Sequence, residues 1–198
     1  MKKRILITIL LFALSISAKA KVNAGVGWGY CPQVLKTERV SYIPNSIGYR
    51  ISDGRAGFSY FTNEFIYASV GADITKHFSM LLKGGFMGVD YNYTVTPLTA
   101  EARYYFKGYD RQGLFLSMEG GVALHNWDFE DRFGMLSAGM GHREMLFKSL
   151  SLDFTLRITC ANYHPLPLDK YEGVIPRPQV IYSNTHSLLI SLGVGLNF

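Results

Sequence analysis

Charged side chains recur at every second position of several runs in this sequence, which is the spacing at which side chains of a β-strand share one face. Acids and bases gathered in this way can neutralise one another by ion pairing, or they can line a path for an ion or a polar solute. We expect a charge network that fills the interior of the fold, and the solute path is the alternative. The predicted network has six members: Lys83, Glu101, Arg103, Glu119, Asp153 and Arg157.

A serine and a histidine two residues apart on a strand could form a nucleophile and its base, because both side chains would face the same way. The sequence has one such pair, His77 and Ser79, and it lies at an expected turn. His186 and Ser187 are adjacent, so on a strand they would point to opposite faces. We therefore expect no enzyme and no catalytic residue. The other polar candidates share one long connection without a spacing that indicates a site: His164, Asp169 and Ser183.

The five histidines are dispersed, and none of their spacings is that of a metal site, so we expect no metal and no cofactor. The two cysteines, Cys31 and Cys160, also lack the CxxC spacing of zinc or redox sites. Both fall near expected strand ends on the same side, and an exported protein meets oxidising conditions. They are candidates for a disulfide that tethers the first long connection, and two free thiols are the alternative.

Alternation of apolar and polar residues over most of the chain predicts β-strands. The clearest run is 150–160, where every even position is apolar and every odd position is polar. On a helix this set would spread around the axis, whereas on a strand it forms one apolar and one polar face. Seven further runs alternate in the same way, some less cleanly: 22–30, 65–74, 78–89, 98–106, 114–127, 133–143 and 187–198.

These eight runs predict an all-β fold, an eight-stranded antiparallel transmembrane β-barrel of up-and-down topology. Most have about the 9–11 residues that a tilted membrane strand needs. Lipid outside and a polar lumen inside would satisfy both faces, and a closed barrel leaves no unpaired edge in the bilayer. Short and long connections alternate, so we expect both ends of the barrel chain on the periplasmic side. A soluble barrel of lipocalin type is the rival fold.

The first long connection, 31–64, carries a further strand signal. Residues 47–51 alternate up to Asp53-Gly54, and alternation resumes at 58–60. Asp-Gly between two alternating runs is a strong hairpin signal. We interpret this segment as a β-ribbon inside the loop, with its turn at Asp53-Gly54. A ten-stranded barrel is the alternative.

Aromatic residues gather near both ends of the expected strands, as the interfacial girdles of membrane barrels do. Ordinary aromatic residues of the core are the alternative. The outer set is Trp28, Tyr30, Phe65, Tyr91, Tyr93, Trp127 and Phe129, and the inner set is Phe78, Tyr104, Phe106, Phe147 and Phe198.

The first twenty residues have the organisation of a secretory signal peptide. Basic residues 2–4 precede an apolar segment, 5–16, and the Ala-Lys-Ala of 18–20 matches a cleavage site, so we expect a barrel domain of 21–198. The whole chain has 20 Lys and Arg against 15 Asp and Glu, but four of these bases and none of the acids lie in the signal segment. The remainder is nearly neutral, and we expect no nucleic-acid partner.

Three segments carry a family resemblance: the signal, the stretch AEARYYF at 100–106 and the end LGVGLNF at 192–198. The chain resembles the small outer-membrane β-barrel proteins of Gram-negative bacteria, the group of OmpA- and OmpX-type barrels, in their Bacteroidetes form. The resemblance covers essentially all of 21–198. It implies an outer-membrane location, contact with outer-membrane lipid, and a C-terminal aromatic residue, Phe198, that the barrel-assembly machinery reads.

The resemblance says more about architecture than about activity, because unrelated functions share this fold. We expect a monomer with a plugged polar lumen and a structural or surface-interaction role through its extracellular loops, 31–64 and 161–186. The sequence identifies no extracellular ligand. A narrow porin-like channel is the first alternative. A lipid A-modifying enzyme is the second, but barrels of that kind carry a His-x-Ser pair toward the outer leaflet, whereas His77 and Ser79 are expected on the periplasmic side.

Overall fold

The computed structural model describes residues 21–90, 93–125 and 128–198, so the predicted signal peptide at 1–20 lies outside the described residues. No helix among the described residues is long and apolar enough to cross a membrane. Eight strands form one antiparallel barrel: β1 (Lys21–Tyr30), β4 (Glu64–Thr75), β5 (Phe78–Asp90), β6 (Tyr93–Tyr105), β7 (Gly113–His125), β8 (Asp128–Phe147), β9 (Leu150–Tyr163) and β12 (Val180–Asn197).

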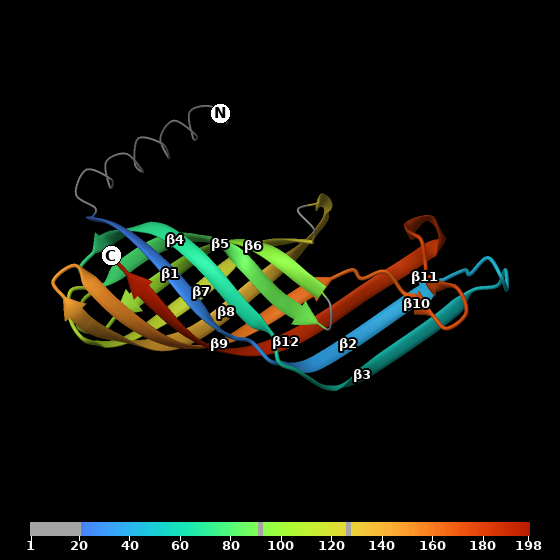
Figure 1. Cartoon of the computed structure of the whole chain (residues 1–198), viewed down its shortest axis with the longest axis horizontal. Coiled ribbons are helices and arrows are strands. Elements are labelled where there is room, and N and C mark those ends of the chain that lie inside the picture. The colour runs from blue at the N-terminus through green and yellow to red at the C-terminus, as the bar shows by residue number, and fades with distance from the viewer. Residues whose placement is uncertain (1–20, 91–92, 126–127) are drawn as a thin grey trace, which may run out of the picture.

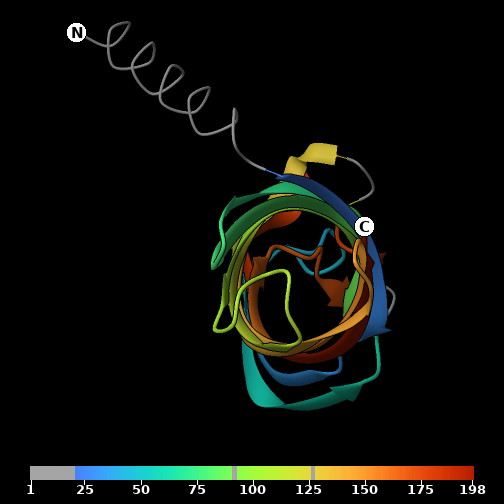
Figure 2. The same cartoon turned by 90° about the vertical axis from the view of Figure 1, so that its left-hand side faces the viewer.

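Pairing of the first strand with the last closes the barrel. β1 and β12 are antiparallel, from Gly25 opposite Asn197 to Tyr30 opposite Leu192. The view along the barrel shows the resulting ring (Figure 2), and β1 begins at the same end of the barrel at which β12 ends (Figure 1). The predicted eight-stranded up-and-down topology is confirmed, and its short connections, such as residues 76 and 77, lie at that end.

The alternation seen in the sequence separates an apolar outer face from the barrel interior. On β9 every odd residue from 151 to 163 is buried, while Phe154, Leu156 and Ile158 are 48%, 43% and 51% exposed on the outside. On β7 Met118 is 64% exposed, and its neighbour Glu119 points inward. A continuous belt of exposed apolar side chains around a closed sheet is the lipid-facing surface of a transmembrane barrel.

Two further strands leave the barrel and form a ribbon. β2 (Gln33–Tyr42) pairs with the outer part of β12, and β3 (Ile51–Phe61) pairs with β2. The hydrogen-bonded sheet thus has ten strands, of which eight close and two extend beyond one rim of the barrel (Figure 1). The β-ribbon expected in the first long connection is present. Its base continues the wall, because residues 185–189 of β12 pair with β2 on one side and with β9 on the other, and its remainder extends beyond the rim.

The turn of the ribbon is not where the sequence placed it. Asp53 and Gly54 lie inside β3, opposite Val40 and Arg39 of β2. The chain turns at 43–50 instead, where Gly48 has a φ of 70°, a backbone conformation that favours glycine. Asp-Gly was misleading because a strand exposed on both faces tolerates residues that a packed strand excludes.

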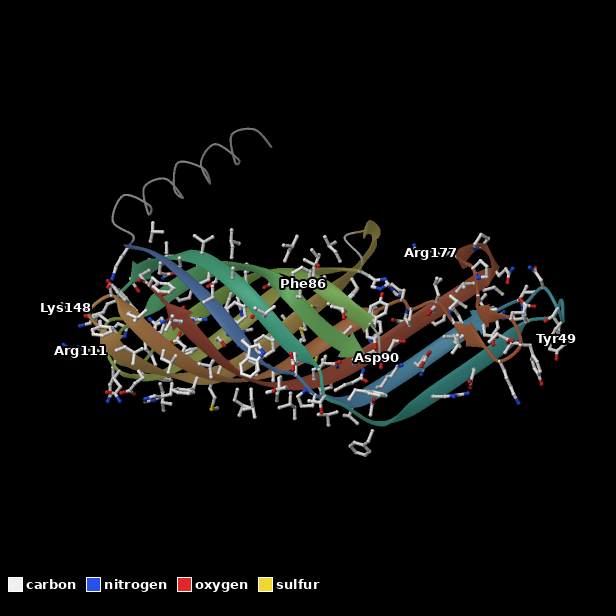
Figure 3. The ribbon with its side chains drawn as sticks, viewed as in Figure 1. Tyr49, Phe86, Asp90, Arg111, Lys148 and Arg177 are labelled. Carbon is white, nitrogen blue, oxygen red and sulfur yellow. The ribbon has the colours of Figure 1, made fainter. Side chains whose placement is uncertain are left out.

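The second long connection, between β9 and β12, lies against the ribbon. It contains the short strands β10 (Leu168–Asp169) and β11 (Gly173–Val174) and a 3₁₀ turn, η1 (Arg177–Gln179). Figure 3 places Tyr49 at the tip of the ribbon and Arg111 and Lys148 at the opposite end of the molecule. The two long connections therefore build one protrusion on the side away from the barrel termini.

The aromatic girdles are present in part. Trp28 and Tyr30 near the outer end, and Tyr104, Phe106, Phe147 and Phe198 near the inner end, are all exposed on the barrel surface. Phe65 and Tyr93 were expected in the outer girdle but pack against the interior cluster instead, because they occupy inward positions of β4 and β6. Tyr91 and Trp127 lie outside the described residues, and the side chain of Phe129 is also outside them.

Two aromatic rings lie directly on glycines of neighbouring strands. A Cβ at Gly27 would come within 2.3 Å of Tyr67 Cζ, and one at Gly141 would come within 2.3 Å of Phe115 Cζ. Each glycine thus lets a ring lie flat against the wall of the barrel, and this close approach is possible only without a side chain.

Gly27→Ala should destabilise the barrel by about 1–3 kcal/mol, because the added methyl group displaces the Tyr67 ring in a packed interior. The measurement is the urea midpoint of the protein in lipid vesicles, followed by tryptophan fluorescence. Gly134→Ala is the matched control, since Gly134 is an exposed strand glycine with no atom within 4 Å of an added Cβ. Equal midpoints for both variants would contradict the packing assigned to Tyr67.

Candidate functional site in the barrel lumen

The six charged residues that the sequence assigned to the interior all lie inside the barrel. They come from four strands, β5, β6, β7 and β9, and the wall brings them to neighbouring heights. Charges buried this deeply are tolerated only when they are paired. The exposed fractions of their side chains are 5% for Lys83, 0% for Glu101, 1% for Arg103, 12% for Glu119, 0% for Asp153 and 7% for Arg157.

Glu101 is the centre of the network. Its Oε2 lies 3.1 Å from Nη2 of Arg103 and 3.4 Å from Nζ of Lys83. Its Oε1 accepts a hydrogen bond of 2.9 Å from Nη2 of Arg157. Three cations from three strands therefore converge on one carboxylate, which is how a fully buried anion can remain charged.

Glu119 extends the network across the lumen. Its Oε2 lies 2.8 Å from Nζ of Lys83 and 2.9 Å from Nη1 of Arg157. Its Oε1 accepts a hydrogen bond of 2.6 Å from Oγ1 of Thr99. Lys83 and Arg157 each touch both Glu101 and Glu119, so the four side chains form a ring in which positive and negative charges alternate.

Asp153 forms a second centre, closer to the end of the barrel where the termini lie. Its Oδ2 accepts hydrogen bonds of 2.7 Å from Arg103 Nη1, 2.8 Å from Arg143 Nη2 and 2.9 Å from Asn197 Nδ2. Its Oδ1 accepts a bond of 2.7 Å from Arg143 Nε, so the guanidinium of Arg143 is bidentate. Arg103 joins this centre to Glu101, and the two parts form one continuous network.

Arg143 is a member that the sequence analysis did not include. Its odd position on β8 put it on the polar, inward face of the run 133–143, but it was not counted among the interior charges. The long arginine side chain reaches back into the barrel and also donates a hydrogen bond of 3.0 Å to the carbonyl of Tyr109. Strand parity was the signal that could have identified it.

Four cations and three carboxylates make up the network once Arg143 is included, which leaves one excess positive charge. Aromatic rings lie against three of the cations. Lys83 Nζ is 4.0 Å from the centroid of Tyr67, Arg143 Cζ is 4.6 Å from that of Tyr105, and Arg103 Cζ is 5.2 Å from that of Phe115. Such cation–π contacts stabilise positive charge where water is scarce.

An apolar cluster fills the other half of the lumen, toward the rim that carries the ribbon. Aromatic stacking strengthens it, with the Tyr93 ring centroid 4.1 Å from that of His125 and 5.1 Å from that of Tyr163. The alternation in the sequence did not predict this layer. Its buried members are Cys31, Met87, Val89, Val95, Ala123, Phe133, Met135, Ala161, Tyr163 and Leu189, and Phe65 and Tyr93 pack against them.

The structure does not form the predicted disulfide between Cys31 and Cys160, and both are free thiols. Cys31 is buried in the apolar cluster, where its thiol donates a hydrogen bond of 3.4 Å to the carbonyl of Gly88. Cys160 occupies an outward position of β9 and is exposed on the outer surface. The prediction placed both residues at the correct rim but overlooked that they face opposite sides of the wall.

Polar contacts join the base of the ribbon to the barrel at this rim. Nζ of Lys36 on β2 lies 2.5 Å from Asp90 Oδ2 at the end of β5, and the hydroxyl of Tyr163 donates a bond of 3.1 Å to the same oxygen. Nε2 of Gln33 donates a bond of 2.5 Å to Ser187 Oγ. The ribbon is thereby fixed to the barrel by side chains as well as by its pairing with β12.

A cavity of only about 40 Å³ remains between the charge network and the apolar cluster. It reaches the wall beside Pro97 of β6, a residue without an N–H group for the strand ladder. This volume accommodates a few water molecules at most. Its lining combines the two layers and includes Tyr67, Lys83, Met87, Glu119, Met135 and Arg157.

The serine and histidine candidates have other partners. Ser79 Oγ donates a bond of 2.5 Å to Asp73 Oδ1, and the ring of His77 contacts the carbonyl of Tyr105. Ser187 is buried in the interior, while the adjacent His186 is exposed outside, as strand parity predicted. Among the described residues, no group of three His, Cys, Asp or Glu side chains could hold a metal ion. Asp169 pairs with Tyr42, and Ser183 bonds to the carbonyl of Pro165.

Comparison with known proteins gives only distant likenesses. No family model matches the sequence, and no curated protein matches it. The outer membrane protein OprG from Pseudomonas aeruginosa is 10% identical with a TM-score of 0.48, over 90% of this chain and 97% of OprG. The outer membrane protease OmpT from Escherichia coli is 8% identical with a TM-score of 0.44, over 91% of this chain and 96% of OmpT. The fold assigned above rests on this chain's own strand pairing.

Two carboxylates hold the second long connection against the ribbon. Asp169 accepts hydrogen bonds from the amides of Tyr171 and Glu172, at 2.8 and 3.2 Å, and from the hydroxyl of Tyr42, at 3.0 Å. These bonds, the backbone amide of Tyr171 first among them, lower the pKa of Asp169. Glu172 accepts bonds from the backbone amides of residues 45 and 46 at the ribbon turn, and bonding to residue 46 lowers its pKa.

Asp153→Asn should destabilise the barrel by about 3–5 kcal/mol, because it leaves the buried guanidinium of Arg143 without a counter-charge and removes one of the two carboxylates that pair with Arg103. The measurement is again the urea midpoint in lipid vesicles. Asp110→Asn is the matched control, since Asp110 is an exposed residue of a turn at the same end of the barrel. A midpoint for Asp153→Asn that equals the control would contradict the central role of this carboxylate.

Acid should release the second long connection from the ribbon. The folded-state pKa values of Asp169 and Glu172 lie below their ordinary values of 3.8 and 4.5, so their contribution is present above those values and is lost as the pH falls through the lowered ones. Amide hydrogen exchange of residues 45 and 46, corrected for the intrinsic effect of pH, should therefore speed up only below about pH 4. Glu172→Gln should weaken their protection already at pH 7, and unchanged protection in this variant would disprove the contact.

Proposed function

We propose that this protein is a non-enzymatic outer-membrane barrel whose lumen is plugged and whose work is structural or adhesive, through the protrusion built by its two long connections. The observation that carries the proposal is the filling of the lumen. A charge network spans one half, an apolar cluster fills the other, and the cavity between them has a volume of about 40 Å³. An eight-stranded barrel is narrow enough for side chains to fill it.

The outer surface supports the membrane location. An apolar belt and exposed aromatic residues at both ends suit the hydrocarbon core and the two interfaces of a bilayer. We further propose that residues 1–20 direct export, that outer-membrane lipid surrounds the belt, and that the barrel-assembly machinery reads Phe198 on the last strand. The finer likeness to OmpA- and OmpX-type barrels of Bacteroidetes stays a prediction. One chain completes the barrel, which supports a monomer within its own membrane.

The protrusion supports a role at the cell surface. The ribbon has about ten residues per strand and extends beyond the barrel rim, and side-chain contacts such as Lys36 with Asp90 hold it in place. A barrel that only anchored itself in lipid would need no such extension. Its exposed residues belong to the connections 31–64 and 161–186, which together form the surface that meets other molecules.

Planar-bilayer recordings test the plug. The wild-type protein should show no stable openings, because the paired side chains leave no continuous aqueous path. Protein for the recordings should first show heat-modifiable gel mobility, so that a silent bilayer reflects a folded barrel. Stable openings whose conductance or selectivity changes in Glu119→Gln or Arg103→Met would overturn the plugged lumen and favour a narrow channel.

A further inference from the structure

β3 is an open edge of the ten-stranded sheet. β2 pairs with one side of it, and within the described ranges no strand pairs with the other side. Residues 52–58 are all exposed, and Phe58 is 85% exposed. Natural proteins usually protect such an edge with lysine, proline or a bulge. The register of β3 with β2 is unbroken from Ile51 to Phe58, and this segment contains neither proline nor lysine.

Opposite charges lie at equal distances on either side of the midpoint of this edge. Gly54 is the central residue of 51–57, and Asp53 and Arg55 flank it. An antiparallel pair of two such strands, related by a twofold axis at Gly54, would place Asp53 of each copy opposite Arg55 of the other. Opposite charges in directly opposed positions stabilise a strand pair. Within one chain Asp53 and Arg55 form a pair 2.9 Å apart, and their side chains are 45% and 82% exposed, so a second copy can reach both charges.

We propose that β3 pairs antiparallel with β3 of a second copy of this chain, over residues 51–57 and about a twofold axis at Gly54. The inference rests on the proposed function in one respect, that the ribbon is extracellular. The partner is identified by two features of the segment: a free hydrogen-bonding edge, and a charge pattern that is complementary to itself. Pairing of this kind is isologous, since the same residues contribute from both copies.

The direction of the strand determines where the second copy lies. β3 runs along the length of the barrel (Figure 1), and hence roughly along the membrane normal. Two barrels in one membrane are related by an axis along that normal, which leaves their β3 strands parallel. An antiparallel pair needs an axis in the membrane plane, so the two barrels face one another from opposed membranes. The protein is therefore a homophilic tether between two cell surfaces.

One pair of β3 strands binds with low affinity, whereas many pairs together bind with high avidity. A seven-residue strand pair with two ion pairs is a small interface, and its affinity as an isolated contact is low. Many copies held in two opposed membranes bind together, and this multivalency raises the overall avidity. At about 3.3 Å per residue, the seven steps from Gly54 to Phe61 span about 23 Å, so the two barrel rims would lie about 45 Å apart.

Cross-linking between vesicles tests the register. The full barrel is reconstituted into phospholipid vesicles with both native cysteines replaced, as Cys31→Ala and Cys160→Ser. Gly54→Cys should then give a disulfide-linked dimer under mild oxidation, because position 54 is opposite itself with Cβ atoms about 5 Å apart. Gly57→Cys is the matched control. Its thiol would face Ile51 of the other copy, so it should give no dimer.

A charge exchange tests the chemistry by light scattering from the same vesicles. Asp53→Arg alone and Arg55→Asp alone should each reduce tethering about tenfold or more, because like charges then oppose one another. Vesicles of Asp53→Arg mixed with vesicles of Arg55→Asp should tether as the wild type does, since every opposed pair is again complementary. A structural defect in either variant would not be rescued by mixing.

The outcomes separate this inference from the proposed function. Tethering by either variant alone at the wild-type rate, or equal dimer yields from Gly54→Cys and Gly57→Cys, overturns the pairing of β3. Wild-type vesicles that do not tether overturn it as well, even when the barrel is folded and electrically silent. Stable channel openings overturn the plugged lumen and leave the tethering result unaffected.

Discussion

The absence of water in a bilayer is the constraint on which this structure depends. Every backbone N–H and C=O group within the hydrocarbon core must bond to another part of the chain, and the pairing of β1 with β12 achieves this for the sheet as a whole. Eight strands give a barrel too narrow for an open aqueous pore. Closure thus determines how the inward-facing polar side chains are satisfied. They are turned away from lipid, share a small space, and must form hydrogen bonds and ion pairs with one another there.

In the charge network, the polar side chains of this narrow interior satisfy one another by ion pairing. Glu101 receives three cations, and Lys83 and Arg157 each bridge two carboxylates. Removing one member leaves its partners less well paired, and the cost of burying so many charges offsets much of their attraction, so such a network contributes a unique arrangement more than it contributes net stability. The apolar cluster fills the other half of the lumen without charges. The two layers differ because the inward odd positions of β5, β6, β8 and β9 change from polar to apolar toward the ribbon.

Strand parity predicted the barrel, its eight strands and the six inward charges, because a period of two assigns each side chain to a face whatever its neighbours are. The features it missed depend on contacts distant in sequence. Arg143 belongs to the network because its long side chain extends back into the lumen. Cys31 and Cys160 differ in the face of the wall that they occupy. Asp53-Gly54 has the local chemistry of a turn but lies in an exposed part of β3. Local signals fail where packing does not restrict the chain.

The bond from Asn197 to Asp153 gives the last strand a second task. β12 is the last strand of the barrel and closes the wall with β1, and the same strand supplies an amide donor to the buried carboxylate of Asp153. A sheet that lacks this strand has an open seam beside Asp153, through which the acid group meets water or lipid headgroups. Completion of the wall and completion of the hydrogen bonds to Asp153 are therefore a single event. The hydrogen bonds of the interior are therefore complete only in the closed barrel and not in a sheet that lacks its last strand.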